Sequence, residues 1–459
     1  MAADKSTYGN SAVYVVDGCR TPFLKAAGKP GPFTASDLAV YAGRNLLARL
    51  PFSTKEFDQL ILGCVMPGPD EVNIARVVAL RLGFDEAVPA YTVQRNCASG
   101  LQSLDNAARD IASGNADLIL AGGTESMSHA PLLFSQAMIS WLAGWNRAKG
   151  LGARGKALLK FRLHYLAPII GLLRGLSDPI VGMSMGQTAE KIAHRFGISR
   201  EMMDEYAVRS HQRLAQAQEN GWFDAEMETL YSADGRFFTY DNGVRADTDV
   251  DKLAKLKPVF DRHFGKVTAG NSAQITDGAA LLVLASEEAV RRHRLKVLGR
   301  LVDCQWAGLD PSQMGLGPVH AVTPILQRHQ LGLHDVDLWE INEAFAAQVL
   351  ACLAAWNSDD YCRDELGLPS AMGEIDQQRL NIDGGGVSLG HPVGASGARI
   401  VLHLLHALAR TNKNKGIASL CIGGGQGGAM LVERVTAPQP VTPRPTDSQT
   451  TEHNHDDAE

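Results

Sequence analysis

Short apolar runs alternate with amphipathic segments along the first 123 residues of the chain. The apolar runs have the length of buried strands, and the amphipathic segments have the 3.6-residue period of helices. The predicted strands are residues 12–16, 59–63, 90–93 and 117–123, and the predicted helices are residues 36–50, 73–82 and 98–112. Strands that alternate with helices indicate an α/β fold with a mainly parallel sheet covered on both faces.

The same order of elements recurs near the C-terminus. Strands are predicted at residues 338–341 and 417–421, and helices at residues 343–356 and 398–409. Two short sequences recur with them: Ala98-Ser99-Gly100 reappears as Ala395-Ser396-Gly397, and Ala121-Gly122-Gly123 has a counterpart in Gly423-Gly424-Gly425. A tripeptide alone can repeat by chance, but its agreement with the order of elements favours an internal duplication into two α/β halves.

A long insertion, residues 129–263, interrupts the first half, and the chain returns to the core at residues 268–271. The insertion is predicted to be mainly helical, for example at residues 186–196 and 200–220. The expected division is a first half at residues 1–128 and 264–290, a loop domain at 129–263, a second half at 291–435 and a tail at 436–459. The tail is rich in Pro, Thr, Ser, His and acidic residues, which predicts disorder.

One stretch of the insertion, residues 136–177, is basic and amphipathic. No Asp or Glu occurs between His129 and Ser177, and aromatic and leucine side chains are mixed with cations. The cations are Arg147, Lys149, Arg154, Lys156, Lys160, Arg162 and Arg174. Three interpretations stay open: a helix on an anionic membrane surface, a docking surface for an acidic partner, and a solvated face that steers a polyanionic substrate.

Composition excludes several classes of protein. The 459 residues are enough for two or three domains, and the formal net charge of −6 does not suggest a nucleic-acid partner. The seven cysteines are odd in number, scattered and without a C-x-x-C pair, which argues against a disulfide framework or zinc site and for a reducing compartment. Since the sequence has no apparent signal peptide or membrane-spanning run, we expect a cytoplasmic protein.

Two cysteines and one histidine occur in loops of small residues, which suggests thiolate chemistry. Cys97 precedes a predicted helix whose N-terminal amides favour a thiolate, although a lone cysteine is usually a small buried hydrophobe. His391 lies between Gly390 and Pro392, and Cys421 ends an apolar strand before a run of glycines. Glycines leave backbone N–H groups uncovered, as a developing oxyanion requires. The alternative for Cys421 is the packed end of a strand.

The remaining cysteines, Cys19, Cys64, Cys304, Cys352 and Cys362, lie in no comparable loop and are expected to be core or neutral. Asn342 follows a predicted strand and precedes a predicted helix, so on pattern alone it is either a helix N-cap or a functional amide.

Together these sequences resemble the thiolase family over residues 12–435. The segments that carry the resemblance are Asn96-Cys97-Ala98-Ser99-Gly100, Gly122-Gly123-Thr124-Glu125-Ser126-Met127-Ser128, Asn342-Glu343-Ala344-Phe345, Gly390-His391-Pro392 and Cys421-Ile422-Gly423-Gly424-Gly425-Gln426-Gly427, with Arg20-Thr21-Pro22-Phe23 near the start. The resemblance implies a thiolase-like fold, in which two duplicated α/β halves form a layered α-β-α-β-α core and a mainly helical loop domain is inserted in the N-terminal half.

The resemblance also implies a role for each residue of the site. Cys97 resembles the acylated nucleophile, His391 the base that takes its proton and then helps to hold the thioester oxygen, and Cys421 the acid/base at the α-carbon of acetyl-CoA. Asn342 resembles the residue that positions a water in the oxyanion hole with His391, and the N–H groups of Cys97 and Gly423 resemble a second oxyanion hole. The substrate-binding residues implied are Ser272, Ala273, Met127, Phe345 and Gly424. Many relatives have a hydroxyl residue near the pantetheine where Ala273 stands, so this chain departs from the family pattern there.

The implied reaction is reversible CoA-dependent cleavage of 3-ketoacyl-CoA in β-oxidation, with coenzyme A as a substrate and no metal or redox cofactor. Because the basic segment 136–177 is long, the chain resembles most the thiolase β subunit of trifunctional-type complexes. The expected partners are a second copy in a homodimer or dimer of dimers, a hydratase/dehydrogenase α subunit, and the inner membrane surface through peripheral contact.

Three alternatives differ in testable features. A biosynthetic thiolase would form acetoacetyl-CoA with the same residues. A decarboxylating ketoacyl synthase would have a second histidine in place of Asn342 and no Cys421. A non-catalytic lipid carrier or scaffold would have lost Cys97, His391 or Cys421, all of which are present.

Overall fold

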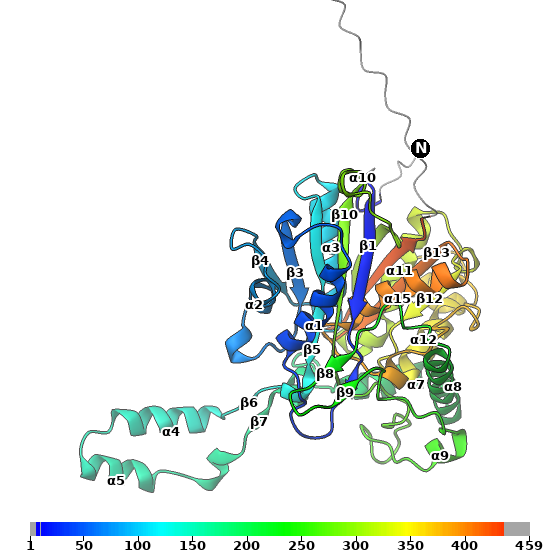
Figure 1. Ribbon diagram of the computed structural model, residues 1–459. Helices are drawn as coiled ribbons and strands as arrows, with labels where there is room; N and C mark the ends of the chain where they lie inside the picture. The colour runs from blue at the N-terminus through cyan, green and yellow to red at the C-terminus, as the bar shows by residue number, and fades with distance from the viewer. Residues whose placement is uncertain (1–5, 10, 436–459) are drawn as a thin grey trace, which may run out of the picture.

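The computed structural model describes residues 6–9 and 11–435, so the predicted tail at 436–459 lies outside the described residues (Figure 1). Within that part of the chain, ten strands form one mixed sheet. Along the sheet the strands follow the order β12-β13-β14-β11-β1-β10-β5-β3-β4, and β2 adds to the side of β10. Their bounds are β1 Val13–Arg20, β2 Leu24–Lys25, β3 Gln59–Gly63, β4 Ala90–Val93, β5 Leu118–Ser126, β10 Thr276–Ser286, β11 Gly299–Gly308, β12 Leu338–Ile341, β13 Lys415–Ile422 and β14 Gln426–Glu433.

The expectation of a mainly parallel sheet is wrong. Only the outer strands pair in parallel, namely β3 with β4 and β5, and β12 with β13. The middle of the sheet is antiparallel, because β10 returns from the insertion between β1 and β5 and runs opposite to both. In the second half β13 and β14 form a hairpin, which is antiparallel by necessity.

The internal duplication is confirmed by the topology. The first half has the order β1-β10-β5-β3-β4, and the second half repeats it as β11-β14-β13-β12. A parallel bridge between Trp339 and Leu380 occupies the place in the second half that β4 has in the first. The two halves meet where β1 and β11 pair over residues 13–15 and 299–301.

Helices divide the molecule into the expected α-β-α-β-α layers. On the outer faces lie α1 (Ala35–Ala48) and α2 (Ile74–Arg81) over the first half, and α11 (Gly317–Arg328) and α12 (Ala346–Trp356) over the second. Between the halves lie α3 (Ser99–Ala112) and α15 (Ser396–Arg410), whose apolar side chains share one core with both inner sheet faces.

The repeated Ala-Ser-Gly sequences lie where these two inner helices cross. A Cβ on Gly100 would lie 2.8 Å from the carbonyl oxygen of Gly394, and one on Gly397 would lie 2.4 Å from the backbone nitrogen of Leu101. Glycine at both positions therefore permits an approach that a larger residue would prevent. The similarity of the two tripeptides has a packing reason as well as an ancestral one.

Most predicted bounds agree with the structure to within a few residues. The strands at 59–63, 90–93 and 338–341 match in full. The helix predicted from residue 343 begins only at Ala346, because Phe345 is extended (φ −147°, ψ 142°) and forms a bridge with Ser272. The helix predicted from residue 36 begins at Ala35, with a capping box between Thr34 and Asp37.

The inserted segment contains α7 (Met185–Arg195), α8 (Arg200–Glu219), α9 (Val250–Ala254) and the short hairpin of β8 (Leu230–Tyr231) and β9 (Phe237–Phe238). A fully buried ion pair joins it to the first half: Nε of Arg20 in β1 donates to Glu226 at 2.6 Å, and its Nη1 donates to Asp241 at 2.8 Å. His403 of α15 contacts the other oxygen of Glu226 at 3.1 Å, so the insertion is anchored to both halves. Removing one member of such a buried cluster would leave uncompensated charge.

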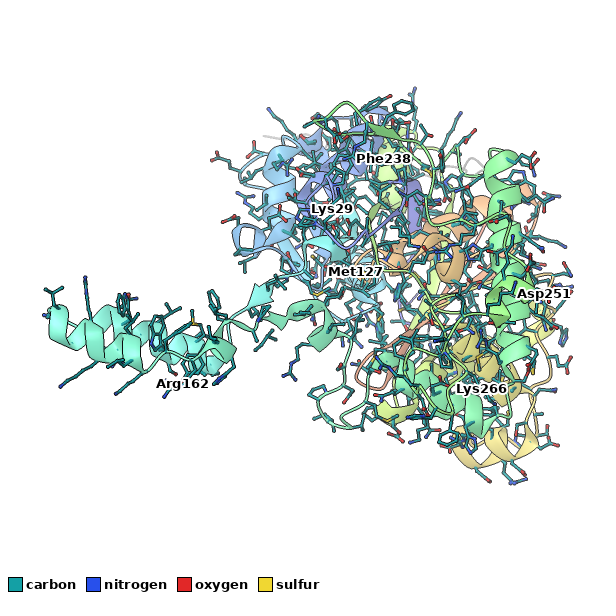
Figure 2. The ribbon with its side chains drawn as sticks, turned by 90° about the horizontal axis from the view of Figure 1, so that it is seen from below. Lys29, Met127, Arg162, Phe238, Asp251 and Lys266 are labelled. Atoms are coloured by element: carbon teal, nitrogen blue, oxygen red, sulfur yellow. The ribbon has the colours of Figure 1, made fainter. Side chains whose placement is uncertain are left out.

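The basic segment forms an excursion away from the body, as Figures 1 and 2 show; Figure 2 labels Arg162 upon it. Its stalk is the two-stranded pairing of β6 (Leu132–Leu133) with β7 (Ile169–Ile170), and beyond the stalk lie α4 (Gln136–Arg147), α5 (Leu151–Leu159) and the turn η4 (Leu163–Leu166). After β7, the short helix α6 (Gly171–Gly175) leads back to the body. We call residues 132–170 the excursion.

The remaining helical segments are α10 (Glu287–His293), α13 (Asp359–Leu366), α14 (Gly386–Leu389), η1 (Thr54–Glu56), η2 (Pro69–Glu71), η3 (Met127–His129), η5 (Pro311–Leu316) and η6 (Leu333–Asp335). Among the described residues, no helix combines the length and the apolar character needed to cross a membrane.

Candidate active site

A cavity of about 870 Å³ opens where the two halves and the insertion meet. Its walls are largely apolar and include Cys97, His391 and Cys421. Cys97 is more than 290 residues before His391 in the sequence. Four of the predicted substrate-binding residues also line it: Met127, Ser272, Ala273 and Phe345. The structure therefore brings both thiols and the imidazole to one cavity, as their loops suggested.

Cys97 lies in the turn between β4 and α3. The preceding residue, Asn96, has a left-handed backbone (φ 43°), which asparagine tolerates better than most residues. The hydroxyl of Ser99 donates to the carbonyl of Asn96 at 2.8 Å and accepts from the backbone N–H of Arg95 at 2.9 Å. This turn holds the half-buried Cys97 immediately before the first turn of α3.

The electrostatic environment of Cys97 has two opposing parts. Burial raises the pKa of its thiol, while the backbone N–H groups of Gly423 and of Cys97 itself donate toward the sulfur and act in the opposite direction. The net direction is upward, so the resting group is a thiol that needs a base before it can attack. The same two N–H groups are those expected to form an oxyanion hole.

His391 is placed to serve as that base. It follows Gly390, which has a φ of +106° and lies so close to Thr276 that a Cβ at this position would be 2.2 Å from its methyl carbon. Its Nδ1 lies 2.6 Å from the hydroxyl of Ser396, and its buried Nε2 has no hydrogen-bond partner in the described residues. Burial, followed by the charge of Arg399, lowers the pKa of His391 to about 4, so the ring is neutral near pH 7 and can accept a proton.

Cys421 lies at the end of β13, just before the hairpin turn, and is 1% exposed. Burial raises the pKa of its thiol well above the usual value, and the charge of a Cys97 thiolate acts in the same direction. A thiol with a raised pKa holds its proton until a strongly basic carbon or a base is adjacent, which suits an acid that protonates an enolate.

Asn342 does not cap a helix, because α12 begins four residues later with Phe345 at the N-cap position. The side chain is buried, and neither its Oδ1 nor its Nδ2 has a hydrogen-bond partner in the described residues. Its backbone N–H donates to Ser419 at 2.9 Å, which fixes its position beside β13. A buried amide with two unpaired groups costs free energy unless a water or ligand completes it. Asn342 does not itself line the cavity.

The neighbouring Glu343 was not singled out by the sequence, yet it organises this region. Its buried carboxylate accepts hydrogen bonds from the hydroxyls of Tyr206 (2.9 Å) and Ser210 (2.6 Å) on α8. It also accepts from Nδ2 of Asn381 at 2.9 Å and from the backbone N–H of Val387 at 3.1 Å. One side chain thus joins α8 to the loop that leads to His391. The sequence signal that could have identified Glu343 is its position next to Asn342 in the segment Asn342-Glu343-Ala344-Phe345.

The glycines of the β13–β14 turn have different structural roles. Gly424 adopts φ +92° and Gly425 φ +75°, and a Cβ on Gly425 would lie 2.3 Å from the carbonyl oxygen of Leu309. At Gly423 a Cβ would lie 3.2 Å from the sulfur of Met185, which lines the cavity. Neither Gly423 nor Gly424 lines the cavity itself, so the substrate contact expected of Gly424 stays a prediction.

Three basic residues on the cavity wall belong to none of the motifs. Lys25 and Arg245 are exposed, and His211 is buried with its Nδ1 accepting from the backbone N–H of Arg245 at 3.1 Å. Partial desolvation of the ammonium group, followed by the charge of Arg245, lowers the pKa of Lys25, which indicates that the two cations share one region. Lys25 is in β2, more than 180 residues before the other two. His211 is in α8, and Arg245 is in a loop, so the sequence pattern could not group the three residues.

Comparisons with known proteins agree with this geometry. The family model described as "Thiolase, N-terminal domain" matches residues 13–288, and "Thiolase, C-terminal domain" matches residues 295–434. The predicted boundary between residues 290 and 291 falls between these ranges. A 3-ketoacyl-CoA thiolase of Yersinia pestis (strain Pestoides F) is 38% identical over 423 residues, which cover 92% of this chain and 96% of the relative.

Solved structures give the same result. Human mitochondrial 3-ketoacyl-CoA thiolase, in complex with CoA, superposes with a TM-score of 0.79 and 36% identity over 93% of this chain and 98% of that one. The Bacillus anthracis acetyl-CoA acetyltransferase superposes with a TM-score of 0.79 and 37% identity over 93% and 99% of the two chains. The chain belongs to the thiolase family of acyltransferases, and the family predicted from the sequence is confirmed.

Proposed function

We propose that this protein catalyses the CoA-dependent cleavage of 3-ketoacyl-CoA to acetyl-CoA and a shortened acyl-CoA, through an acyl-Cys97 intermediate, as a step of fatty acid β-oxidation. The observation that carries the proposal is the convergence of Cys97, His391 and Cys421 on one cavity. The similarity to 3-ketoacyl-CoA thiolases over nearly the whole chain supports the same substrate class.

In the first half-reaction, Nε2 of His391 takes the thiol proton of Cys97, and the thiolate attacks the C3 carbonyl of the substrate. The C2–C3 bond then breaks, C3 remains on sulfur as a thioester, and the electron pair leaves on the enolate of acetyl-CoA. Cys421 protonates the α-carbon of that enolate. The enolate is a poor leaving group, so donors aimed at its oxygen lower the barrier. Nε2 of the now protonated His391, and a water held by the unpaired amide of Asn342, are suited to that task.

In the second half-reaction, the thiol of CoA gives its proton to the Cys421 thiolate that the first half-reaction left, and attacks the acyl-Cys97 carbonyl. The tetrahedral oxyanion forms next to the sulfur, where the N–H groups of Cys97 and Gly423 point. Collapse of this intermediate releases the shortened acyl-CoA and restores the Cys97 thiolate. The scheme splits one difficult step into two and predicts ping-pong kinetics.

The residues of the site also distinguish between the alternative functions. Asn342 and Cys421, both present and buried, disfavour a decarboxylating ketoacyl synthase. An intact set of Cys97, His391 and Cys421 around an open cavity disfavours a non-catalytic carrier or scaffold. Biosynthetic acetoacetyl-CoA formation stays the second candidate, because the acetyl-CoA acetyltransferase of Bacillus anthracis is as similar in fold as the human 3-ketoacyl-CoA thiolase.

The decisive experiment measures CoA-dependent thiolysis across 3-ketoacyl-CoA substrates from four to sixteen carbons, with Cys97→Ala as the inactive control. Faster cleavage of the longer substrates supports the β-oxidation role. Activity confined to acetoacetyl-CoA favours the biosynthetic alternative, and no activity above the control on any substrate overturns both.

For substrate binding we propose that Lys25 and Arg245 attract the phosphates of CoA to the mouth of the cavity, since both side chains are exposed cations on its wall. Burial, followed by the charge of Arg245, lowers the pKa of His211 to about 4, so its neutral ring can contribute hydrogen bonds but no charge near pH 7. The role of Ser272 and Ala273 in contacting the pantetheine stays part of this proposal. No metal or redox cofactor enters the scheme.

For partners we propose a homodimer or a dimer of dimers, a hydratase/dehydrogenase α subunit and peripheral contact with an anionic membrane, in a cytoplasmic setting. The edge strand β4, which ends the sheet and is only partly buried, supports association with a second copy. The excursion supports membrane contact, because it contains six of the seven cations of the basic segment and also exposes Leu151, Leu159 and Leu163 by 80% or more.

A further inference from the structure

We propose that Ser396 is a positioning residue for the reaction, because its hydroxyl holds His391 in the tautomer that has its proton on Nδ1 and a free lone pair on Nε2. The proposal rests on the function proposed above, in which Nε2 takes the proton of Cys97. It adds a residue to which neither the sequence patterns nor that scheme gives a task.

The contact between the side chains of Ser396 and His391 is short and buried. Oγ of Ser396 lies 2.6 Å from Nδ1 of His391, and Ser396 is fully buried in the first turn of α15. Within the described residues it is the one side-chain hydrogen bond of the imidazole, while Nε2 has none. The backbone N–H of His391 donates to the carbonyl of Gln274 at 3.2 Å, so the main chain of His391 is held by Gln274 and its ring by Ser396.

The count of hydrogens selects the tautomer. A serine hydroxyl has one hydrogen and two lone pairs. The carbonyl oxygen of Pro392 lies 3.1 Å from Oγ of Ser396 and can only accept, so the hydroxyl hydrogen goes there. The hydroxyl then accepts from Nδ1–H of His391. With the opposite tautomer, Nε2–H would be buried without an acceptor, and an unpaired buried donor is costly. The Nδ1–H tautomer leaves only a lone pair at Nε2.

The duplication gives the same arrangement a second time. Ser99, the counterpart of Ser396, also begins an inner helix, donates to a carbonyl of the preceding turn and accepts a hydrogen bond from it. In the first half that turn holds the nucleophile, and in the second half it holds the base. Each inner helix therefore begins with a serine that is hydrogen-bonded to the turn carrying a reacting group, although only Ser396 contacts the reacting side chain itself.

The test compares Ser396→Ala with Ser396→Thr, which restores a hydroxyl, and with Ser103→Ala. Ser103 is a matched control because it is also fully buried on an inner helix and makes two hydrogen bonds, to Ile61 and from Gly122, away from His391. The full-length proteins are assayed for single-turnover acylation of Cys97 by 3-ketoacyl-CoA and for alkylation of Cys97 by iodoacetamide. Alkylation requires the thiolate but no thiolase turnover.

For Ser396→Ala we expect both rates to fall on the order of tenfold or more with little change in KM, because a general base contributes at least that much. We expect Ser396→Thr to recover most of both rates, and Ser103→Ala to keep them despite a lower melting temperature. Unchanged rates in Ser396→Ala, or an equal loss in Ser103→Ala, overturn the proposal. If the wild type acylates from no 3-ketoacyl-CoA, the proposed function fails, while the alkylation comparison still decides the role of Ser396.

The tautomer itself is measured by nitrogen-15 NMR of histidine-labelled protein at pH 7.5, with the His391 signals identified by their loss in His391→Asn. We expect a protonated Nδ1 and an unprotonated Nε2 in the wild type, and a mixture in Ser396→Ala. A wild-type spectrum with the proton on Nε2 overturns the assignment.

Discussion

Nδ2 of Asn96 donates a hydrogen bond to the carbonyl oxygen of Gly423 at 2.8 Å and so ties the turn of the nucleophile to the hairpin turn of the opposite half. The backbone N–H of Gly423 points toward the sulfur of Cys97. The carbonyl and the N–H of Gly423 are thus bound by two adjacent residues, Asn96 and Cys97. The distance between the thiol and its expected oxyanion donors therefore depends on Asn96.

Replacement of Asn96 by glycine removes this bond and keeps the left-handed backbone that the turn requires. We expect kcat for thiolysis to fall about fivefold, since one lost hydrogen bond is worth about 1 kcal/mol. The matched control is Asn412→Gly, which changes another left-handed asparagine far from the cavity and should leave kcat unchanged. Equal kcat values for Asn96→Gly and the wild type would show that the tie is not needed.

For the nucleophile, incubation with acyl-CoA and no acceptor is expected to leave an acyl group on the Cys97 peptide, detected by mass spectrometry. Cys97→Ser should lose the adduct, because a hydroxyl ionises far less readily than a thiol and burial already opposes the charge. Cys421→Ala should still be acylated at Cys97 but should fail to exchange the α-proton of acetyl-CoA. Exchange at the wild-type rate in Cys421→Ala would place the acid/base elsewhere.

The amide of Asn342 has no hydrogen-bond partner, whereas that of Asn381, its matched control, donates to Ile341 and Glu343 and accepts from the backbone of Ile341. We expect Asn342→Ala to lower kcat on the order of a hundredfold, as for a lost oxyanion donor, with little change in melting temperature. Asn381→Ala should lower the melting temperature clearly. Normal kcat with reduced stability for Asn342→Ala would assign it a structural role.

The pKa of His391, lowered to about 4, has a consequence for pH dependence. The ring stays neutral in the folded protein down to about pH 5, so kcat should show no acid limb near pH 6.5. Between about 6.5 and 4 the unfolded chain binds a proton that the folded chain does not, so this group destabilises the fold as the pH falls. Urea unfolding should show less of this loss in His391→Asn, and a kcat midpoint near pH 6.5 that requires His391 would contradict the lowered pKa.

The sequence predicted the elements of the fold better than their arrangement. Apolar runs bounded by turn residues located β3, β4 and β12 to the residue, because a buried strand needs a run of this length. Strand β10 was not among the predicted strands. Its direction could not have been predicted either, because the alternation of side chains along a strand does not show which way the strand runs, and the chain returns to the sheet only after the insertion at residues 129–263.

The site shows the same limit. Cys97, His391 and Cys421 could be found because each lies in a conspicuous loop of small residues, and a family resemblance joined them. Lys25, His211 and Arg245 could not, because single basic residues are common and only the folded chain places them on one wall. The hydroxyl of Ser396 was visible in a repeated tripeptide, but its contact with His391 depends on the turn at Gly390.

The excursion provides the last prediction. Its stacked Trp141 and Trp145 and the ring of Phe161 form a small aromatic cluster, with ring centroids 5.7 and 4.9 Å from Trp141, so the exposed leucines and cations are carried by an ordered unit. Burial of leucines in lipid and attraction of cations to anionic headgroups would act together there. We therefore expect the wild type to co-sediment with anionic vesicles and not with neutral ones, and to lose this binding when Lys156, Lys160 and Arg162 are changed to Glu.

The matched control changes Lys29, Lys55 and Lys296 to Glu, which alters the net charge equally at exposed positions outside the excursion and should keep vesicle binding. Thiolysis of a short soluble substrate should be the same in all three proteins if the excursion serves only docking, because no residue of the excursion lines the cavity that contains Cys97 and His391. If the wild type ignores anionic vesicles and the excursion variant shows only a raised KM for acyl-CoA, the cations steer the substrate and membrane docking is wrong. If neither vesicles nor KM responds, an acidic partner subunit becomes the expected occupant of this surface.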